Sequence, residues 1–271
     1  MRKNKSAFLS VPYIIFMVVF TLIPLCVVAY YALTEPTTGK FTLGNLKELS
    51  MYMPVLGQSV LYSLVSAMIC LLLGYPVAYY IAHRGKVMQK ILYMLVMLPM
   101  CMSFLLRTLA WVGLLQDTGI INNFLDWIGI GRVQLIRTPA AVVLGMVYNY
   151  LPYMILPLYA IIVKIDNRLI EAAEDLGCTP IQTFVKVVLP LSVPGILSGI
   201  TMVFVPAVST FYISQKLGGT DTVLIGDVIE RLFKQGNNAN LGAALSLVLM
   251  LLVLVCTGIM NRFGGDEEVI V

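Results

Sequence analysis

Six long apolar runs alternate with shorter polar segments along the chain. They cover residues 11–33, 60–82, 91–115, 140–163, 187–213 and 241–260. A helix needs about 20 mostly apolar residues to cross the hydrocarbon core of a bilayer, which is about 30 Å thick. The pattern therefore predicts an all-α integral membrane protein with about six transmembrane helices.

The first run follows Arg2, Lys3 and Lys5, as the apolar segment of a signal peptide would. Such segments are only about 7 to 15 residues long. Because the run at 11–33 is longer, we expect it to remain as an uncleaved transmembrane helix.

Lys and Arg are distributed unequally between the two sets of connecting segments. One set holds Arg2, Lys3, Lys5, Arg84, Lys86, Lys90, Lys164, Arg168, Lys186 and Arg262. The other set holds Lys40, Lys47, Arg132, Arg137, Lys216, Arg231 and Lys234 in longer segments. The positive-inside tendency assigns the first set to the cytoplasm. Both termini are then predicted to be cytoplasmic.

Composition supports the membrane class and excludes several kinds of chemistry. The 271 residues are 59% hydrophobic and 12% charged, and the basic residues that give the net charge of +4 form no patch for nucleic acid. His83 is the only histidine and the five cysteines lie far apart, so we expect no metal site and no catalytic triad. The chain also lacks a phosphate-binding G-x-x-x-x-G-K-[ST] loop. Energy for any driven process must come from elsewhere.

A charged segment at residues 164–190, which we call the elbow, interrupts the apolar pattern. Its first part has apolar residues at helical spacing, with Asp166 as a potential N-cap and Gly177 as a left-handed terminator. Thr179, Pro180 and Gln182 then match an N-cap, an N1 proline and the N3 partner of a capping box. The pattern predicts two short helices with a fixed bend. On spacing alone, it fits either a docking surface for another protein or an interfacial loop that returns the chain to the membrane.

The residues of the elbow resemble the EAA loop of the permease subunits of ATP-binding-cassette (ABC) importers. The matching positions are Glu171, Ala172, Ala173, Gly177, Val187, Leu189 and Pro190. The resemblance implies the type I ABC importer permease (MetI-like) fold, with the elbow seated in a groove of a cytoplasmic ATPase. It makes Glu171 and Gly177 contact residues. The full coupling set that we predict is Glu171, Ala172, Ala173, Asp175, Gly177, Thr179 and Pro180.

Further segments, among them "LLLGYPVAYYIAHRGK" and "LGMVYNYLPYMILPLYA", resemble the permeases of spermidine/putrescine importers. This resemblance implies a multi-pass protein of the bacterial inner membrane, surrounded by lipid. Its implied partners are a second homologous permease, two copies of an ATPase that binds ATP and Mg²⁺, and an extracytoplasmic polyamine-binding protein. No cofactor and no catalytic residue are expected in this chain.

The resemblance also suggests a division of the chain into three parts. Residues 1–57 would form the N-terminal cytoplasmic tail, the first transmembrane helix and an outer loop. Residues 58–260 would form the core permease domain, with coupling helices near 164–190, and residues 261–271 a C-terminal cytoplasmic tail.

Polar and aromatic residues within the spans are candidates to line a passage for polycations, because aromatic faces and neutral oxygens bind ammonium groups. The predicted set is Arg107, Trp111, Tyr148, Asn149, Tyr153, Ser209, Thr210, Tyr212 and Asp227. Pro206 is expected to bend the fifth span and free carbonyl groups near the last of these. The alternative for the tyrosines is packing between helices. For the pair Gly195 and Gly199, we favour packing within the chain over contact with a partner.

Arg107 is the one ionisable residue predicted well inside the membrane, which makes it a functional candidate. We expect it to pair with Asp117 or with backbone carbonyls and to organise a gate, the alternative being that its side chain extends outward to water. Asp117, Asp126, Asp221, Asp227 and Glu230 are acids on the predicted outer side. Asp227 is either an acceptor at the mouth of the passage or a solvated loop acid.

Three other functions fit the hydropathy pattern less well. An ion-coupled secondary transporter usually carries acids at the membrane midplane, and the spans have none. A membrane enzyme would need a cluster of catalytic groups that scattered acids and one histidine do not supply. A passive channel would leave the elbow without a role. A permease for another small solute or for iron remains the nearest alternative to a polyamine permease.

Overall fold

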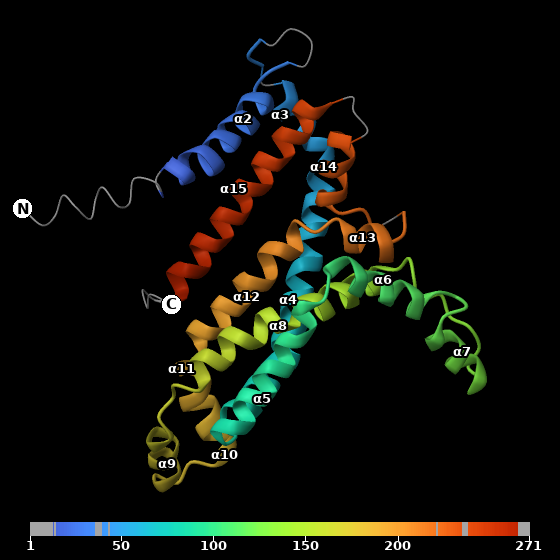
Figure 1. Cartoon of the computed structure of the whole chain (residues 1–271). Coiled ribbons are helices and arrows are strands. Elements are labelled where there is room, and N and C mark those ends of the chain that lie inside the picture. The colour runs from blue at the N-terminus through green and yellow to red at the C-terminus, as the bar shows by residue number, and fades with distance from the viewer. Residues whose placement is uncertain are drawn as a thin grey trace, which may run out of the picture. The chain divides into compact units, whose positions relative to one another are not determined.

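The computed structural model describes residues 13, 15–35, 40–42, 44–220, 222–234 and 238–264. Within these ranges the regular structure is helical, apart from one isolated bridge between Thr34 and Phe41 (Figure 1). This confirms the predicted all-α class. The predicted N-terminal tail, Asp221 and residues 265–271 lie outside the described residues.

The chain divides into two compact units. We call Met1–Pro54 with Val228–Leu252 the terminal unit, and Val55–Asp227 with Val253–Val271 the central unit. The terminal unit contains η1 (Val18–Leu22), α2 (Ile23–Ala32), α3 (Gly44–Glu48) and η2 (Leu49–Tyr52). It also contains most of α14 (Ile225–Lys234) and the first part of α15 (Ala239–Gly264).

Two buried amides hold the terminal unit together where α2 ends. Asn45 Nδ2 donates to the carbonyl oxygens of Ala32 and Thr34, both at 3.0 Å. Asn240 Nδ2, from the start of α15, donates to the same Thr34 oxygen at 2.6 Å. These bonds satisfy carbonyl groups that have no partner within a helix at its C-terminal end.

The central unit contains the helices that build the candidate sites. They are α4 (Met53–Ala82), α5 (Lys86–Met97), η3 (Leu98–Cys101), α6 (Phe104–Leu115), α7 (Ile120–Trp127), α8 (Pro139–Ile162), α9 (Asn167–Asp175), α10 (Pro180–Thr183), η4 (Phe184–Val188), α11 (Leu189–Leu191), α12 (Val193–Val208) and α13 (Tyr212–Leu217). The core lies around α8, where Met146, Met154 and Leu158 are fully buried. Thr138 fixes the start of α8, because its Oγ1 accepts the Ala141 N–H at 3.2 Å.

The helices confirm about six spans. Among the described residues, five helical stretches are long and apolar enough to cross a membrane: Ile15–Ala32, Leu49–Ala82, Phe104–Trp127, Pro139–Ile162 and Ala239–Met260. Pro180–Leu191 and Val193–Val208, which meet at an angle of 63°, give a sixth span if the bent pair crosses the membrane as one unit. The cytoplasmic position of both termini stays a prediction.

The expected single span at 91–115 is wrong. The chain instead forms α5, the 3₁₀ turn η3 and α6, with extended backbone at Met102 and Ser103 between η3 and α6. Pro99 lies in the first turn of η3, where its missing N–H does no harm, but it cannot continue the hydrogen bonding of α5. The surrounding Met, Cys and Leu side chains keep the segment apolar, so hydropathy alone does not reveal the break.

Gly195 and Gly199 allow α12 to approach α8 closely. A Cβ on Gly195 would lie 3.1 Å from Ile161 Cβ and 3.2 Å from the Pro157 carbonyl oxygen. A Cβ on Gly199 would lie 2.6 Å from Met154 Sδ. The favoured interpretation, packing within the chain, is therefore confirmed.

Candidate functional site

The first helix of the elbow begins and ends as its sequence predicts. Asp166 Oδ1 accepts the Arg168 N–H at 3.0 Å and so caps α9. At the other end, Gly177 has a φ of +83°, the left-handed conformation that suits glycine. Its N–H donates to Glu174 O at 2.8 Å, and the Cys178 N–H donates to Ala173 O at 3.0 Å. This pair of bonds is a Schellman motif, which satisfies the last carbonyl groups of α9.

The second helix of the elbow starts with the predicted capping box. The Gln182 N–H donates to Thr179 Oγ1 at 3.4 Å, and the Thr179 N–H donates to Gln182 Oε1 at 3.0 Å. Pro180 occupies the first position of α10. Cys178 completes the first motif and Thr179 begins the second, so the bend between α9 and α10 is closely specified.

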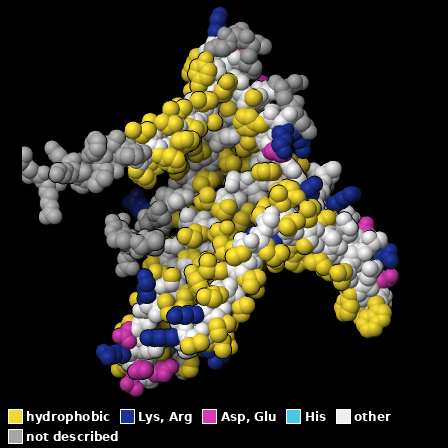
Figure 2. Space-filling model, viewed as in Figure 1, with side chains coloured by type: hydrophobic (Ala, Val, Ile, Leu, Met, Phe, Trp, Pro, Cys, Tyr) yellow, Lys and Arg dark blue, Asp and Glu magenta, His cyan; other side chains and the backbone are white. Residues whose placement is uncertain are grey.

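Most of the predicted coupling residues lie at the surface of the elbow. The exposed ones are Glu171, Ala172, Asp175, Gly177, Thr179 and Pro180, whereas Ala173 is buried. Acidic side chains gather over α9 in Figure 2. Two large apolar side chains accompany them, since Leu176 is 86% exposed and Ile181 is 76% exposed. The elbow thus presents apolar side chains within a charged surface.

Aromatic contacts join the elbow to the bundle. The Phe184 ring meets the rings of Tyr75 and Tyr79 of α4 edge-on, with centroids 5.5 and 5.7 Å apart. The Tyr75 hydroxyl is 2.9 Å from Ser192 Oγ, where α11 gives way to α12. One tyrosine of α4 therefore contacts both the segment after α10 and the start of α12.

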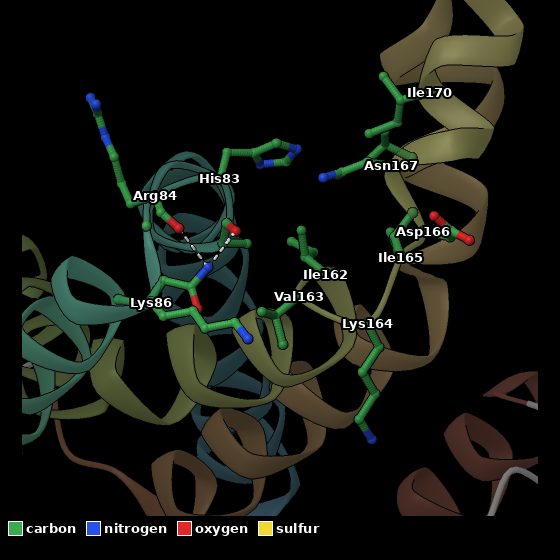
Figure 3. A pocket seen from close by; sticks show the side chains of 14 residues that line it. His83, Arg84, Lys86, Ile162, Val163, Lys164, Ile165, Asp166, Asn167 and Ile170 are labelled. Atoms are coloured by element: carbon green, nitrogen blue, oxygen red, sulfur yellow. Dashed lines mark hydrogen bonds between the residues drawn. The ribbon is translucent and has the colours of Figure 1, made fainter.

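A cavity of about 690 Å³ lies beside the elbow, and we call it the His83 cavity. It is lined by Ala82, His83, Arg84, Gly85, Lys86, Gln89, Ile162, Val163, Lys164, Ile165, Asp166, Asn167, Ile170 and Val188. In Figure 3 the side chains of His83 and Asn167 point toward one another from opposite walls. Gln89 Nε2 closes the end of α4 by donating to the carbonyl oxygens of Ala82 and Arg84 at 2.9 and 2.8 Å.

A second cavity, of about 430 Å³, lies where α6, α8 and the break between α12 and α13 meet, and we call it the Arg107 cavity. It is lined by Phe104, Leu105, Arg107, Asn149, Tyr150, Tyr153, Ser209, Thr210, Phe211 and Tyr212. Six of the nine predicted passage residues are therefore brought together: Arg107, Asn149, Tyr153, Ser209, Thr210 and Tyr212. They come from three predicted spans that are far apart in the sequence.

Some polar groups of the Arg107 cavity have hydrogen-bond partners among the described residues, and one buried oxygen does not. The Tyr150 hydroxyl donates to Pro206 O at 3.3 Å, and Ser209 Oγ donates to carbonyl oxygens of Val205 and Pro206 at 3.2 and 3.3 Å. Asn149 is 1% exposed, and its Nδ2 donates to Gly145 O at 2.9 Å. Its Oδ1 has no hydrogen-bond partner among the described residues. That oxygen is an available acceptor in a buried position.

Arg107 has no counter-charge in the part of the chain that the structure describes. Its side chain is 6% exposed, and Nε and Nη1 have no hydrogen-bond partner there. The expected pairing with Asp117 is wrong. Asp117 is exposed and follows the C-terminal end of α6, whereas Arg107 lies in the first turn of that helix, about 15 Å away along the axis. The alternative of outward extension is also wrong, because the side chain is buried.

Three predicted passage residues lie outside this cavity. The rings of Trp111 and Tyr148 pack against each other edge-on, with centroids 5.4 Å apart. Asp227 is 5% exposed, and its Oδ2 accepts the Leu224 N–H at 2.9 Å near the start of α14. The alternative of a solvated loop acid is therefore wrong for Asp227.

Two sets of lining residues were not predicted from the sequence. Phe104, Leu105 and Phe211 line the Arg107 cavity but read as ordinary apolar positions, and only their closeness to helix breaks could have marked them. The segment His83–Lys86 was not predicted to line a cavity, although its polar run between two apolar stretches fits the edge of one. No group of three or more potential metal ligands occurs within the described ranges.

Comparison with known proteins gives a consistent result. The family described as "Binding-protein-dependent transport system inner membrane component" matches residues 71–264. The spermidine/putrescine transport system permease protein PotB of Escherichia coli (strain K12) is 37% identical over 217 residues, which are 79% of each chain. The protein of the same name from Haemophilus influenzae is 38% identical over 246 residues, 88% of this chain and 86% of that one.

A solved structure shares the fold over nearly the whole chain. It belongs to a bacterial ABC transporter involved in the import of the acidic polysaccharide alginate. The TM-score is 0.82 at 20% identity, with 98% of this chain and 97% of the other covered.

Proposed function

Given that the chain belongs to the family of binding-protein-dependent transport system inner membrane components, we propose that it is one of two permease subunits of an ATP-driven polyamine importer. It forms half of the passage through the membrane and takes spermidine or putrescine from an external binding protein. The chain hydrolyses no ATP itself. A partner ATPase performs that reaction and drives the passage through the elbow.

The surface of the elbow is the observation that carries this proposal. Leu176 and Ile181 are largely exposed on a segment that also presents Glu171, Glu174 and Asp175. Side chains of this charge are unfavourable in hydrocarbon, so the elbow lies outside the membrane core, where exposed apolar side chains are typical of a protein-binding surface. The capped ends of α9 and α10 hold this surface in one conformation, which reduces the entropy lost on docking.

The walls of the Arg107 cavity carry side chains that can bind a polyamine. Aromatic rings of Phe104, Tyr153 and Tyr212 can pack on methylene groups and attract ammonium groups, and Asn149 Oδ1 is an available acceptor. The ten lining residues include no Asp or Glu, and Arg107 is a fixed cation among them, so a fixed negative charge for a polycation has to come from another subunit. The names of the two relatives above point to the same class of substrate.

The complete transporter that we propose contains four kinds of protein subunit, of which this chain is one. A second permease, homologous to this chain, completes the passage. Two copies of an ATPase bind ATP and Mg²⁺ on the cytoplasmic side, and a polyamine-binding protein delivers the substrate on the other side. Lipid surrounds the two permeases.

The ATPase activity of the assembled complex in lipid tests the proposal. The complex is purified with its binding protein, and turnover is measured with and without spermidine for the wild type and for Glu171→Lys. We expect spermidine to raise wild-type turnover, and the mutant to lose both this stimulation, by about tenfold or more, and its bound ATPase.

A matched control uses the same exchange at an exposed acid that is not part of the elbow. Glu48→Lys, at the end of α3, should retain stimulated turnover. ATPase turnover that is unchanged by spermidine but raised by another small solute would overturn the polyamine assignment alone. A wild-type chain that never co-purifies with an ATPase would overturn the importer function.

A further inference from the structure

Arg107 places a permanent positive charge where the described residues provide nothing to balance it. A guanidinium group stays protonated in proteins, so the free-energy cost of burying its charge cannot be avoided by loss of a proton. Nε and Nη1 are buried and find no acceptor within the described ranges. Leaving such donors unsatisfied in a buried site is costly, which favours an acceptor that the described residues do not supply.

The position of Arg107 in its helix strengthens the need for an anion. The residue lies in the first turn of α6, a helix of 12 residues. The N-terminal end of a helix already carries partial positive charge, which disfavours a cation and attracts an anion. The N-terminal end of α6 and the Arg107 guanidinium group therefore both attract an anion to this part of the cavity.

The proposed substrate cannot provide that group, because a polyamine carries ammonium groups and no acceptor once it is protonated. Two of the side chains that line the cavity, Leu105 and Phe211, are 49% and 41% exposed, so a neighbouring subunit can contact this wall. A carboxylate on a membrane helix of a neighbouring subunit has the charge and the two oxygens that match a guanidinium group. The second permease is the neighbour that shares the passage with this chain.

We propose that Arg107 forms an ion pair with a carboxylate of the second permease subunit, and that this pair closes the passage between transport cycles. The inference rests on the proposed function for the presence of that subunit. An ammonium group entering the cavity competes with Arg107 for the carboxylate. The substrate thus replaces the guanidinium group as the partner of the acid, and the passage opens around it.

A charge exchange across the two permeases tests this pairing. In the assembled complex, Arg107→Glu should lower the apparent melting temperature by several degrees and reduce spermidine uptake at least tenfold. Each Asp and Glu in the membrane helices of the second permease is then replaced by Arg, one at a time, in the Arg107→Glu background. We expect one such exchange to restore the melting temperature and at least half of the uptake.

A milder variant tests closure without reversing the charge. Arg107→Gln in proteoliposomes without ATP should increase passive spermidine leak at least threefold. Arg132→Glu serves as control, because its partial exposure and its contact with Asp126 place it outside the cavity. That variant should leave melting temperature and leak within experimental error.

Two outcomes would overturn the pairing. One is failure of every exchange in the second permease to restore Arg107→Glu, as expected if a lipid phosphate or water balances the charge instead. The other is a wild-type melting temperature for Arg107→Glu. Since melting requires no substrate, rescue of the melting temperature in a complex that does not transport spermidine would support the ion pair while contradicting the polyamine assignment.

Discussion

At the scale of single residues, Arg107 and Asn149 each have a buried polar atom without a hydrogen-bond partner among the described residues. Polar groups such as Arg107 and Asn149 stand out in an apolar span because they are costly there. Their surroundings depend on helix rotation and on breaks in distant segments, which periodicity does not determine. Tyr148 illustrates this limit, since it neighbours Asn149 in sequence but packs against Trp111 outside the cavity.

A glycine behind the Arg107 cavity gives a prediction at this scale. A Cβ on Gly145 would lie 2.5 Å from Leu217 Cδ1 and 3.0 Å from Ile213 Cγ2, so Gly145→Val should force α13 away from α8. We expect a loss of about 1–3 kcal/mol in the free energy of unfolding, as is typical for overpacking. Thermal unfolding of the purified complex in detergent measures it.

Gly113→Val is the matched control, because Gly113 is also helical and a Cβ there would meet nothing within 4 Å. The two variants share the same change in helix propensity. Equal melting temperatures for both would contradict the close packing of α8 and α13.

At the scale of elements, capping chemistry was predictable and helix breaks inside apolar runs were not. Asp166, Gly177 and the Thr179 capping box follow local rules of backbone hydrogen bonding, so a few residues suffice to specify them. The break after Pro99 separates two apolar segments and changes no hydropathy. Such a break is decided by tertiary packing, where neighbouring helices stabilise the freed backbone groups.

Gly177, which ends α9, gives a prediction at the scale of elements. Gly177→Ala places a Cβ on a residue with φ of +83°, which costs roughly 1–2 kcal/mol. Amide hydrogens of α9 and α10 should then exchange about five times faster or more, since such a free-energy change alters populations by that order. Hydrogen–deuterium exchange with mass spectrometry measures the effect.

Gly85→Ala provides the comparison at another helix boundary. Gly85 has φ of −62° and open space where a Cβ would lie, so alanine fits without strain. Unchanged exchange in α9 and α10 for Gly177→Ala, or an equal increase for Gly85→Ala, would argue against the left-handed terminator as the cause.

At the scale of the whole molecule, hydropathy predicted the number of spans because the thickness of the bilayer fixes the length of a spanning helix. It could not predict that Pro180–Leu191 and Val193–Val208 meet at 63°, since a bent span has the same composition as a straight one. The orientation of the chain in the membrane follows from the distribution of Lys and Arg and requires a direct test.

Two native cysteines make that test possible. Cys178 in the elbow is partly exposed, whereas Cys70 in α4 is fully buried. In variants that retain one cysteine, a membrane-impermeant maleimide should label Cys178 in inside-out vesicles but not in right-side-out cells, and bound ATPase should protect it. Cys70 should stay unlabelled in both. Labelling of Cys178 from outside the cell would reverse the predicted orientation.

The contacts of Tyr75 determine how a displacement of the elbow is transmitted. Tyr75 touches the Phe184 ring on one side and the Ser192 hydroxyl on the other, so α4 is fastened to both ends of the segment between α10 and α12. Because both ends of this segment are held against α4, the segment has little freedom to move by itself. A displacement of the elbow would then rotate the helices of the bundle and would deform the connecting segment only slightly.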